Sequence, residues 1–567
     1  SWGVPRSRNR RTRAAEARNT RQRSVLGMLR RPHVIFPLMA ALTARAAAGS
    51  TSTGACFSFA ASTLPASTRW RGTTSSCAAA ALSSRAFRTE RGQFSAPLFS
   101  PHRLPAAPAT GGLARFAMSS AQGARPDGNG VSRMIVVGGG PAGFMCAVEA
   151  ARAARAAGTP LEVIILEATS KVLGKVKISG GGRCNVLHDE TKGAKLISEG
   201  YPRGDKPLLS AFSRFGPVQT ADWFRAEGVV LKTEGDGRMF PVTDSSDTII
   251  EALCRAADGV GVKVRTGQRV DSVSKSEGRF HLSTSNREKD KGAYECDFLM
   301  LSPGSSRLAF QWAATLGHKV EPGVPSLFTF TCSDPVLQGL AGVSVQDAEV
   351  SLPFKVRGRK KTLRERGPVL VTHSGVSGPA VLRLSAFGAR EMHEVKYSAK
   401  MTVNWLPDID RGEAGATEQL ESMKKVFAAK QIGGSSGPTL GLPRRIFQAL
   451  VESTGIELDA KWVNVRAADI RKLAARLVRS ELDISGKGAF KEEFVTAGGV
   501  KLEGVEMKTM ESKEVPGLFF AGEVLDVDGI TGGYNLQAAW TTGWNAGRAI
   551  AAAAAHLEAS HTAASSS

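Results

Sequence analysis

The pattern of apolar and polar positions predicts a strand, a helix and a second strand near the start of the ordered chain. Residues 134–137 form an apolar run that ends in glycines, and an alanine-rich stretch with helical spacing covers 141–157. Gly158 and Pro160 then end the helix, and 161–167 (LEVIILE) is a β-branched run of strand length. This succession is the basic unit of a parallel sheet with covering helices.

The pattern is mixed between the second strand and residue 320. Helical spacing predicts helices around 207–228 and 245–258. Residues 263–285 alternate in polarity between turn signals, which is typical of a small antiparallel meander. An apolar strand that ends in a glycine turn is predicted at 296–304.

The remainder divides into a β-rich part, a helical part and a return to strand and loop. Residues 322–405 alternate weakly, 412–482 contain helical stretches, and a last helix is predicted from about Tyr534 to Ala555. We expect these segments: an extension at 1–130, an α/β domain at 131–320, a β-rich insertion at 321–405, a helical insertion at 406–487, the C-terminal part of the α/β domain at 488–556, and a disordered tail at 557–567.

Charge is unevenly distributed along the 567 residues, whose net charge is +22. Residues 1–130 hold 19 Arg, no Lys and three acids, a net charge of +16. The other residues hold 55 Lys and Arg against 49 Asp and Glu, a net charge of +6. A body this mildly basic, without interleaved aromatic and basic residues, argues against a nucleic-acid partner.

The extension is rich in Arg, Ser, Ala and Thr and poor in acids, which is typical of an organelle transit peptide or a disordered arm. Residues 28–49 add a short apolar run, so a bipartite presequence is one interpretation. We expect an organelle location, with a plastid favoured over a mitochondrion. Alternatively the extension is not translated, the chain starts at Met28, Met39 or Met118, and the protein is cytoplasmic.

The sequence does not predict a zinc site, a disulfide framework or a membrane span. The seven cysteines include no C-x-x-C pair, so neither a zinc site nor a disulfide framework is predicted. No segment after residue 130 is apolar enough to span a bilayer.

A glycine motif follows the first strand directly. Gly138, Gly140 and Gly143 have G-x-G-x-x-G spacing at the start of the first helix. Such glycines allow a tight turn, close approach of the backbone to a pyrophosphate, and close packing of helix and strand. Glu167 ends the second strand, where a carboxylate can accept hydrogen bonds from a ribose diol and would repel a 2′-phosphate. The sequence therefore predicts an unphosphorylated dinucleotide.

The C-terminal stretch favours FAD over NAD as this dinucleotide. Residues 517–522 (GLFFAG) are followed by Glu523, Asp526 and Asp528, and a Gly532-Gly533 turn opens the last helix. The N-terminus of that helix would stabilise the negative charge of a reduced flavin. Only one glycine-rich strand–helix–strand unit is found, so one dinucleotide has a dedicated site.

Residues 177–188 (KISGGGRCNVLH) form an unusual second glycine-rich stretch. Glycines without Cβ atoms can pass close to an isoalloxazine ring, and Arg183 and Asn185 can orient phosphate, ribityl or ring carbonyl groups. A free-standing turn is the alternative. Cys184 is interpreted as a buried packing residue rather than a redox thiol, because no cysteine lies near it in sequence.

Several long motifs resemble the BaiN/aminoacetone-oxidase-like family of FAD-dependent oxidoreductases. They are SGGGRCN, GRMFPVTDSSDTI, LQGLAGVSV, VTHSGVSGPAVLRLS, VTAGGV and TMESKEVPGLFFAGEVLDVDGITGGYNLQAAWTTG, spread over residues 131–553. The resemblance implies a Rossmann-like, glutathione-reductase-type FAD domain, split by an insertion with a β-barrel-like part and a helical part. The sequence departs from the family pattern at Leu187-His188, where Thr and Asn are usual, and at Pro303-Gly304, where Gly-Gly is usual.

Residues and resemblance together predict a set of FAD-binding positions. They are Gly138, Gly139, Gly140, Pro141, Ala142, Gly143, Glu167, Lys175, Gly181, Gly182, Arg183, Cys184, Asn185, Val270, Gly304, Gly522, Glu523, Asp526, Gly532, Gly533, Tyr534 and Asn535. No catalytic proton donor and no metal ligand is assigned. His373 among Ser and Gly is interpreted as a turn residue, with a general acid as the alternative.

The expected function is that of an FAD-dependent oxidoreductase acting on a small organic substrate. NADH or NADPH is the expected electron donor, visiting the flavin transiently, and reduction is favoured over oxidase activity. The alternatives are a flavin-dependent protein that modifies or associates with RNA, and a flavin-binding sensor without turnover.

Overall fold

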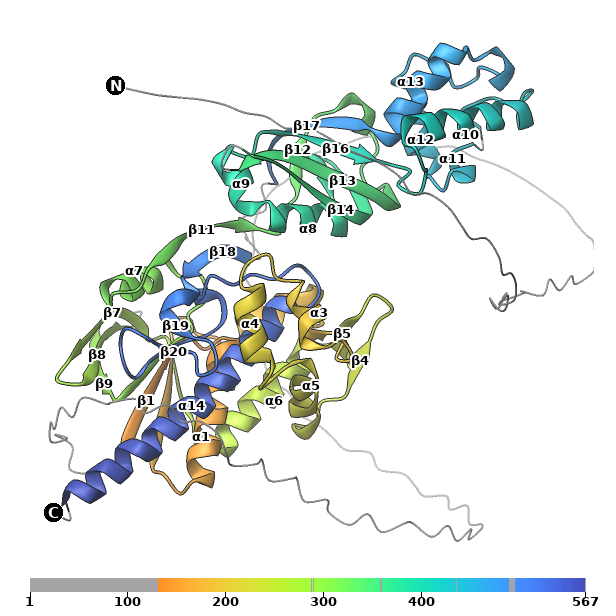
Figure 1. The fold of residues 1–567 in the computed structure, drawn as a ribbon. Coiled ribbons are helices and arrows are strands. Elements are labelled where there is room, and N and C mark those ends of the chain that lie inside the picture. Colours follow the sequence, from red (N-terminus) through yellow and green to blue (C-terminus); the bar gives the residue numbers. More distant parts are fainter. Residues whose placement is uncertain are drawn as a thin grey trace, which may run out of the picture. The chain divides into compact units, whose positions relative to one another are not determined.

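The computed structural model describes residues 131–286, 288, 290–356, 359–434, 436–488 and 495–565 (Figure 1). The extension at 1–130, with the expected targeting signal, lies outside the described residues. None of the helices within those ranges combines the length and the apolar composition that a bilayer span requires.

A seven-stranded sheet is the centre of the α/β domain, in the order β19-β20-β21-β10-β1-β2-β6. The five strands from β21 to β6 are parallel, which confirms the predicted Rossmann-like class. The strands are β1 Ser132–Val137, β2 Leu161–Glu167, β6 Lys263–Thr266, β10 Phe298–Leu301, β19 Val505–Glu506, β20 Glu511–Ser512 and β21 Leu518–Phe520.

Two helices that are far apart in sequence pack closely on each other. They are α1, Pro141–Ala156, and α14, Tyr534–Ser565. A Cβ atom on Gly543 would lie 2.4 Å from the Ala142 carbonyl oxygen, and one on Gly547 would lie 2.4 Å from the Cys146 carbonyl oxygen. The contact therefore depends on glycine. Helix α14 also continues through Ser565, into the segment expected to be a disordered tail.

The region between β2 and β6 carries short elements beside the sheet. The helix expected over 207–228 is two helices, because Pro217 holds Gly216 in an extended conformation (φ −101°, ψ −165°). The elements are α2 Gly174–Ile178, η1 Ser179–Gly182, β3 Leu187–His188, α3 Ala194–Ser198, α4 Asp205–Phe212, α5 Pro217–Ala226, β4 Leu231–Thr233, β5 Arg238–Pro241 and α6 Ser246–Gly259.

The predicted meander is a three-stranded antiparallel sheet of β7 Arg269–Ser276, β8 Arg279–Ser285 and β9 Lys291–Cys296. Helix α7, Arg307–Thr315, follows β10. Strands β11, Val320–Ser326, and β18, Val495–Val500, form an antiparallel pair where the chain enters and leaves the insertion.

The insertion contains a closed barrel in the order β12-β15-β14-β13-β16-β17. Strand β17 lies in the range expected to be helical, yet its alternating burial lets it close the barrel between β16 and β12. The strands are β12 Phe330–Cys332, β13 Ser344–Val356, β14 Arg359–Thr372, β15 Gly375–Ser377, β16 Ala399–Asn404 and β17 Ser480–Lys487. His373 is exposed in the turn between β14 and β15.

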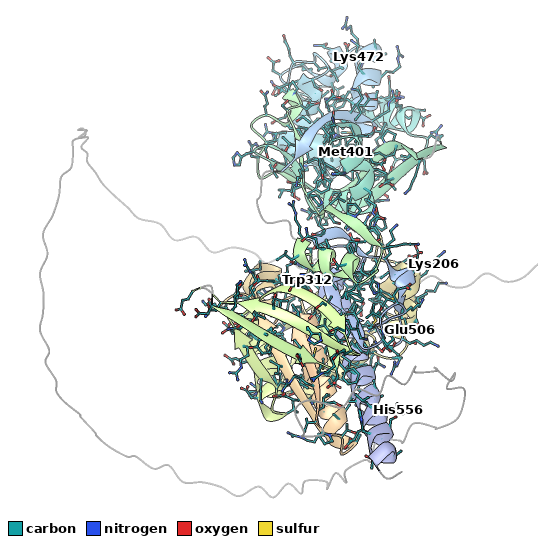
Figure 2. The ribbon with its side chains drawn as sticks, turned by 90° about the vertical axis from the view of Figure 1, so that its left-hand side faces the viewer. Lys206, Trp312, Met401, Lys472, Glu506 and His556 are labelled. Atoms are coloured by element: carbon teal, nitrogen blue, oxygen red, sulfur yellow. The ribbon has the colours of Figure 1, made fainter. Side chains whose placement is uncertain are left out.

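Helices complete the insertion, and its core is separate from that of the α/β domain. Met401 of β16 belongs to the insertion's core and Trp312 of α7 to that of the α/β domain (Figure 2). The helices are α8 Pro379–Phe387, α9 Ala389–Glu394, α10 Glu413–Val426, α11 Ser436–Thr439, α12 Arg444–Glu452 and α13 Ala467–Val478.

The contact between α1 and α14 gives a test of the fold. Gly to Ala inside a helix normally stabilises it by about 1 kcal/mol. We expect Gly547→Ala to do the opposite and to lower the free energy of unfolding by roughly 1–3 kcal/mol, because the new methyl group overpacks against Cys146. The measurement is denaturant unfolding. The matched control is Gly259→Ala at the end of α6, where a Cβ atom would meet none of the described atoms within 4 Å. Equal stability of the two variants would contradict the close approach.

Candidate functional site

The glycines after β1 have different structural roles. Gly138 has a φ of +105°, and a Cβ atom there would lie 2.5 Å from the Ser302 carbonyl oxygen. A Cβ atom on Gly143 would lie 2.1 Å from the Gly138 carbonyl oxygen. At Gly140 it would meet none of the described atoms within 4 Å, and the φ of −89° suits any residue. The fold itself therefore requires Gly138 and Gly143, whereas Gly140 keeps a space open.

This open space lies at the N-terminus of α1. The helix begins at Pro141, and its N-cap residue, Gly140, has no side chain that could accept a hydrogen bond from the first turn. The N–H groups of a first turn have no partner inside the helix, and the helix dipole places partial positive charge there. The turn is thus suited to bind an anion such as a pyrophosphate.

Glu167 is held next to this turn at the end of β2. Its Oε2 accepts a hydrogen bond from the backbone N–H of Gly139 at 2.8 Å. Its Oε1 accepts from the backbone N–H and the hydroxyl of Thr169, both at 2.8 Å. The carboxylate therefore has a fixed position from which it can accept hydrogen bonds from hydroxyl groups.

A cavity of about 460 Å³ runs from the glycine turn past Glu167 to the start of α14. Its lining includes main chain from several strand ends and the apolar side chains of Leu166, Leu173 and Trp312. Of the residues predicted to bind FAD, the cavity brings together Gly138, Gly139, Gly140, Pro141, Ala142, Glu167, Lys175, Val270, Gly304, Gly522, Glu523 and Asn535.

An ion pair lies in the wall of this cavity. Lys175 of α2 donates to Oε2 of Glu523, which belongs to the 3-10 turn η5, Gly522–Val524. Gly304 has a φ of +68°, and a Cβ atom there would lie 3.6 Å from the same carboxylate oxygen. The backbone at Gly304, which has no side chain, thus lies next to a cation and a carboxylate. They suit a ligand that carries both phosphate and hydroxyl groups.

The backbone conformation of the SGGG stretch favours glycine. Gly180, Gly181 and Gly182 have φ values of +58°, +71° and +88°, and Cys184 has +60°. Consecutive left-handed residues cost roughly 1–2 kcal/mol each with a Cβ atom. The backbone conformation alone therefore explains the three glycines, although Gly181 and Gly182 also face open space.

Arg183 lies outside the cavity lining and pairs with acids far from it in sequence. Its guanidinium donates to Glu234 at 2.5 Å and to Asp244 at 2.8 Å. It also stacks over the Phe240 ring, 4.0 Å from the centroid. The cation expected to contact the cofactor therefore holds the β4–β5 region against the glycine stretch.

Asn185 joins the glycine stretch to the turn before α14. Its amide oxygen accepts from the backbone N–H of Gly533 at 3.0 Å, and its nitrogen donates to the Leu187 carbonyl at 3.3 Å. Gly533 has a φ of +93°, and a Cβ atom there would lie 2.5 Å from the carbonyl carbon of Leu187. The two glycine-rich motifs thus form one bonded unit beside the cavity.

His188 belongs to the same unit, although the sequence analysis did not place it in the site. Its ring stacks on Tyr534 with centroids 4.9 Å apart. With Nδ1 donating to the Gly532 carbonyl at 3.2 Å, Nε2 accepts from the Lys192 ammonium at 3.1 Å. Burial first and the Lys192 cation second lower the pKa of His188, so a neutral imidazole is favoured. Its departure from the family pattern was the available signal.

The acids Asp526 and Asp528 do not line this cavity. Asp526 accepts from Arg390 of α9 at 2.6 and 2.8 Å and lines a second cavity of about 490 Å³. Asp528 is buried, pairs with Arg203, and accepts from the Ser326 hydroxyl at 2.7 Å. Both carboxylates therefore bind the loop before α14 to partners that sequence spacing could not identify.

Cys184 is fully buried, and burial raises the pKa of its thiol to about 12. A thiol that stays protonated is a poor nucleophile. This setting agrees with a packing role.

Comparison with known proteins finds a matching family and several relatives. Residues 132–549 match the family described as HI0933-like protein Rossmann domain. A 3-dehydro-bile acid delta(4,6)-reductase from Clostridium scindens is 30% identical over 429 residues, which cover 74% of this chain and 99% of that protein. A ribosomal RNA dihydrouridine synthase from Escherichia coli K12 is 29% identical over 433 residues, 74% of this chain and 98% of that one.

One solved structure shows a weaker likeness. A 3-ketosteroid delta1-dehydrogenase from Sterolibacterium denitrificans matches with a TM-score of 0.40 and 11% identity, over 74% of this chain and 99% of that one. A likeness at this level carries no conclusion about activity.

The role of Cys184 can be tested by thiol labelling of the native full chain. We expect an alkylating reagent at about pH 8 to modify the partly exposed Cys254 much faster than Cys184, because the Cys184 thiol is buried and protonated. Peptide-resolved mass spectrometry measures the two rates. Rapid labelling of Cys184 would contradict the packing role.

The different roles of Gly140 and Gly138 can be tested by substitution. We expect Gly140→Val to abolish co-purification of a flavin while the apoprotein melts within about 2 °C of the wild type, because the side chain occupies ligand space only. Gly138→Ala should instead lower the melting temperature, because its methyl group would collide with Ser302. Visible absorbance and thermal unfolding are the measurements. A yellow Gly140→Val protein would rule out a dinucleotide at this turn.

Proposed function

Because the chain belongs to the HI0933-like Rossmann family of FAD-dependent oxidoreductases, we propose that it is a reductase that uses NADH or NADPH. Its substrate would contain a carbon–carbon double bond conjugated to a carbonyl group. Bound FAD would supply the hydride chemistry for reducing this bond, and the nicotinamide would be the source of the electrons.

The observation that carries the proposal is the space kept open at Gly140, continuous with the cavity that ends at α14. A dinucleotide is long and has phosphates at its middle, and the cavity offers an anion-binding turn between two polar ends. The glycine-rich strand–helix–strand unit occurs once in the sequence, which supports a nicotinamide donor that visits and leaves.

The names of two relatives support reduction of a conjugated double bond. One relative is named as a reductase of a 3-dehydro-bile acid. The other is named for a product, dihydrouridine, which has two more hydrogen atoms than uridine. In uracil the double bond that gains these atoms is conjugated to a ring carbonyl. Both names fit addition of a hydride and a proton to such a bond.

The residues of the cavity would hold and orient the cofactor. Glu167 would accept from the adenosine ribose, the first turn of α1 would bind the pyrophosphate, and Lys175 and Glu523 would contact the phosphate and ribityl region. The side chain of Asn535 bonds to both backbone groups of Gly529, at 2.8 and 2.9 Å, which fixes the turn in front of α14. Bound FAD supplies the hydride transfer, which no side chain can perform.

A uracil base in RNA is a second candidate substrate, and the charge distribution favours it. The insertion, residues 327–488, contains 24 Lys and Arg against 17 Asp and Glu, a net charge of +7. The rest of 131–567 contains 31 against 32, a net charge of −1. The mild positive charge of the body thus lies on the insertion, which is where an RNA partner would be expected to bind.

Anaerobic flavin reduction tests the proposal on the purified full chain. We expect NADH or NADPH to bleach the visible flavin absorbance, and an enone or a uridine-containing RNA then to restore it. The Gly140→Val variant, without flavin, serves as the control for direct reaction of the nicotinamide. If neither NADH nor NADPH bleached the flavin, the proposal that a nicotinamide nucleotide is the electron donor would be wrong. Reoxidation by oxygen alone, with release of peroxide, would indicate an oxidase instead.

A further inference from the structure

The hydroxyl of Tyr534 makes no hydrogen bond to the described residues, although the residue is only 7% exposed. A tyrosine hydroxyl in such surroundings normally has a partner, because a polar group without one loses the hydrogen bonds that water would provide. The fully enclosed side-chain atoms without a partner in the described part of the chain do not include this hydroxyl. Solvent therefore still reaches its oxygen atom.

The ring of Tyr534 is held from several sides. His188 stacks on it with centroids 4.9 Å apart, and Tyr201 meets it edge-on at 5.7 Å. A Cβ atom on Gly200 would lie 2.2 Å from its Cε1 atom, and one on Gly529 would lie 2.5 Å from its Cβ atom. The Tyr201 hydroxyl also donates to the Tyr534 backbone carbonyl at 2.7 Å. These contacts fix the ring and leave its hydroxyl unbound.

Tyr534 begins α14, where the cofactor cavity ends. Asn535, the next residue, is part of the cavity lining. The loop before α14 also contacts the insertion, because Ile530 shares a small apolar cluster with Leu382 and Ala386 of α8. The hydroxyl therefore belongs to a place where the end of the cavity and the insertion come together.

The surroundings keep this phenol protonated at neutral pH. Burial raises the pKa of Tyr534 to about 12, while the Arg383 guanidinium of α8 lowers it and the Asp189 carboxylate raises it. The hydroxyl thus has a proton to give, and the Arg383 cation would stabilise the phenolate that remains. Arg383 is itself held in place, because it donates to Glu365 at 2.9 Å.

Neighbouring titratable groups are less suited to donate a proton. Both ring nitrogens of His188 are engaged in hydrogen bonds. The thiol of Cys184 is fully buried, and Tyr201 is buried with its hydroxyl bound to a backbone carbonyl. Among these side chains, only Tyr534 combines a hydroxyl without a described partner with access from solvent.

We propose that the Tyr534 hydroxyl is the proton donor in the reduction of a conjugated carbon–carbon double bond. The assignment rests on the proposed function, which supplies two electrons as a hydride. The carbon farther from the carbonyl gains this hydride, and the carbon next to the carbonyl takes the proton from the Tyr534 oxygen. One O–H bond breaks, one C–H bond forms, and the phenolate recovers a proton from water. No further oxidant or reductant is needed.

A purely structural role for Tyr534 is the alternative interpretation. Its ring packs on His188 and Tyr201, and phenylalanine would provide the same packing. Packing does not require a hydroxyl, and a hydroxyl without a partner is unfavourable in a largely buried position. The structural role therefore leaves the hydroxyl unexplained.

The test compares the wild-type holoenzyme with Tyr534→Phe, which keeps the ring and removes the hydroxyl. Tyr294→Phe is the matched control, because Tyr294 is a half-buried phenol in β9 of the same domain. Dithionite reduces the flavin anaerobically, so that the result does not depend on a nicotinamide donor. Reoxidation is then followed with an enone, a uridine-containing RNA and a nitroalkene. A nitroalkene that gains a hydride leaves as a stable nitronate anion and needs no proton from the protein.

We expect Tyr534→Phe to keep its flavin and to melt within about 2 °C of the wild type. The enone or the RNA should reoxidise it roughly 10²–10⁴-fold more slowly than the wild type, and the nitroalkene within about twofold. Tyr294→Phe should match the wild type with every acceptor. Wild-type rates of Tyr534→Phe with the enone and the RNA would overturn the assignment. Equal slowing with the nitroalkene would also overturn it, because the defect would then not concern the proton.

A second measurement needs no turnover. The flavin-free Gly140→Val protein is treated with N-acetylimidazole, which acetylates accessible tyrosine hydroxyls, and peptide-resolved mass spectrometry gives the rates. We expect Tyr534 to react faster than Tyr201, whose hydroxyl is bound to a backbone carbonyl. Equal or slower labelling of Tyr534 would show that a substrate cannot reach the hydroxyl and would overturn the assignment.

Failure of the proposed function gives a different result. Reduced wild-type flavin that none of the acceptors reoxidises would overturn the proposed reductase, and the proton donor with it. Reoxidation of the wild type without a selective defect in Tyr534→Phe overturns the proton donor alone. The two failures are therefore distinguishable.

Discussion

The close approach of β1, the following turn and α1 is the contact on which the rest of the site depends. Gly138 and Gly143 have no room for a Cβ atom, because the Ser302 and Gly138 carbonyl oxygens occupy that space. The end of β10 can therefore lie directly against the turn. This arrangement leaves the first turn of α1 facing the cavity with its N–H groups free for a ligand.

Helix α14 brings a second helix N-terminus to the same cavity. Its contact with α1 again depends on glycine, at Gly543 and Gly547. Asn535 and Leu536 consequently line the cavity that begins at Gly138. Two positive helix ends at one elongated cavity suit a ligand with negative charge at more than one place, which a diphosphate and a reduced flavin together would provide.

Paired charges connect the loop before α14 to both parts of the fold. Asp528 is buried against Arg203, which also donates to the Ala386 carbonyl at 2.8 Å, and Asp526 pairs with Arg390 of the insertion. Removing one partner of a buried pair typically costs about 3–5 kcal/mol. These acids are thus needed to position the loop.

The sequence by itself determined the local elements whose signals lie close together in the chain. The β1–α1–β2 unit, its glycines and Glu167 could be predicted, because strand periodicity, helix breakers and turn glycines act over a few residues. The antiparallel meander and the division into a sheet domain and an insertion followed from the same kind of signal. The closure of the barrel by β17 did not, because a short alternating strand after a helical region is a weak local pattern.

Only the tertiary structure decided what several of the predicted site residues do. Arg183 and Asp526 have the residue types of cofactor ligands, yet they pair with Glu234, Asp244 and Arg390, and Asn185 bonds to Gly533. These partners are 51 to 348 residues apart. A charged or amide side chain has the same chemistry wherever it lies, so its partner is set by which distant segments the fold brings within hydrogen-bonding distance.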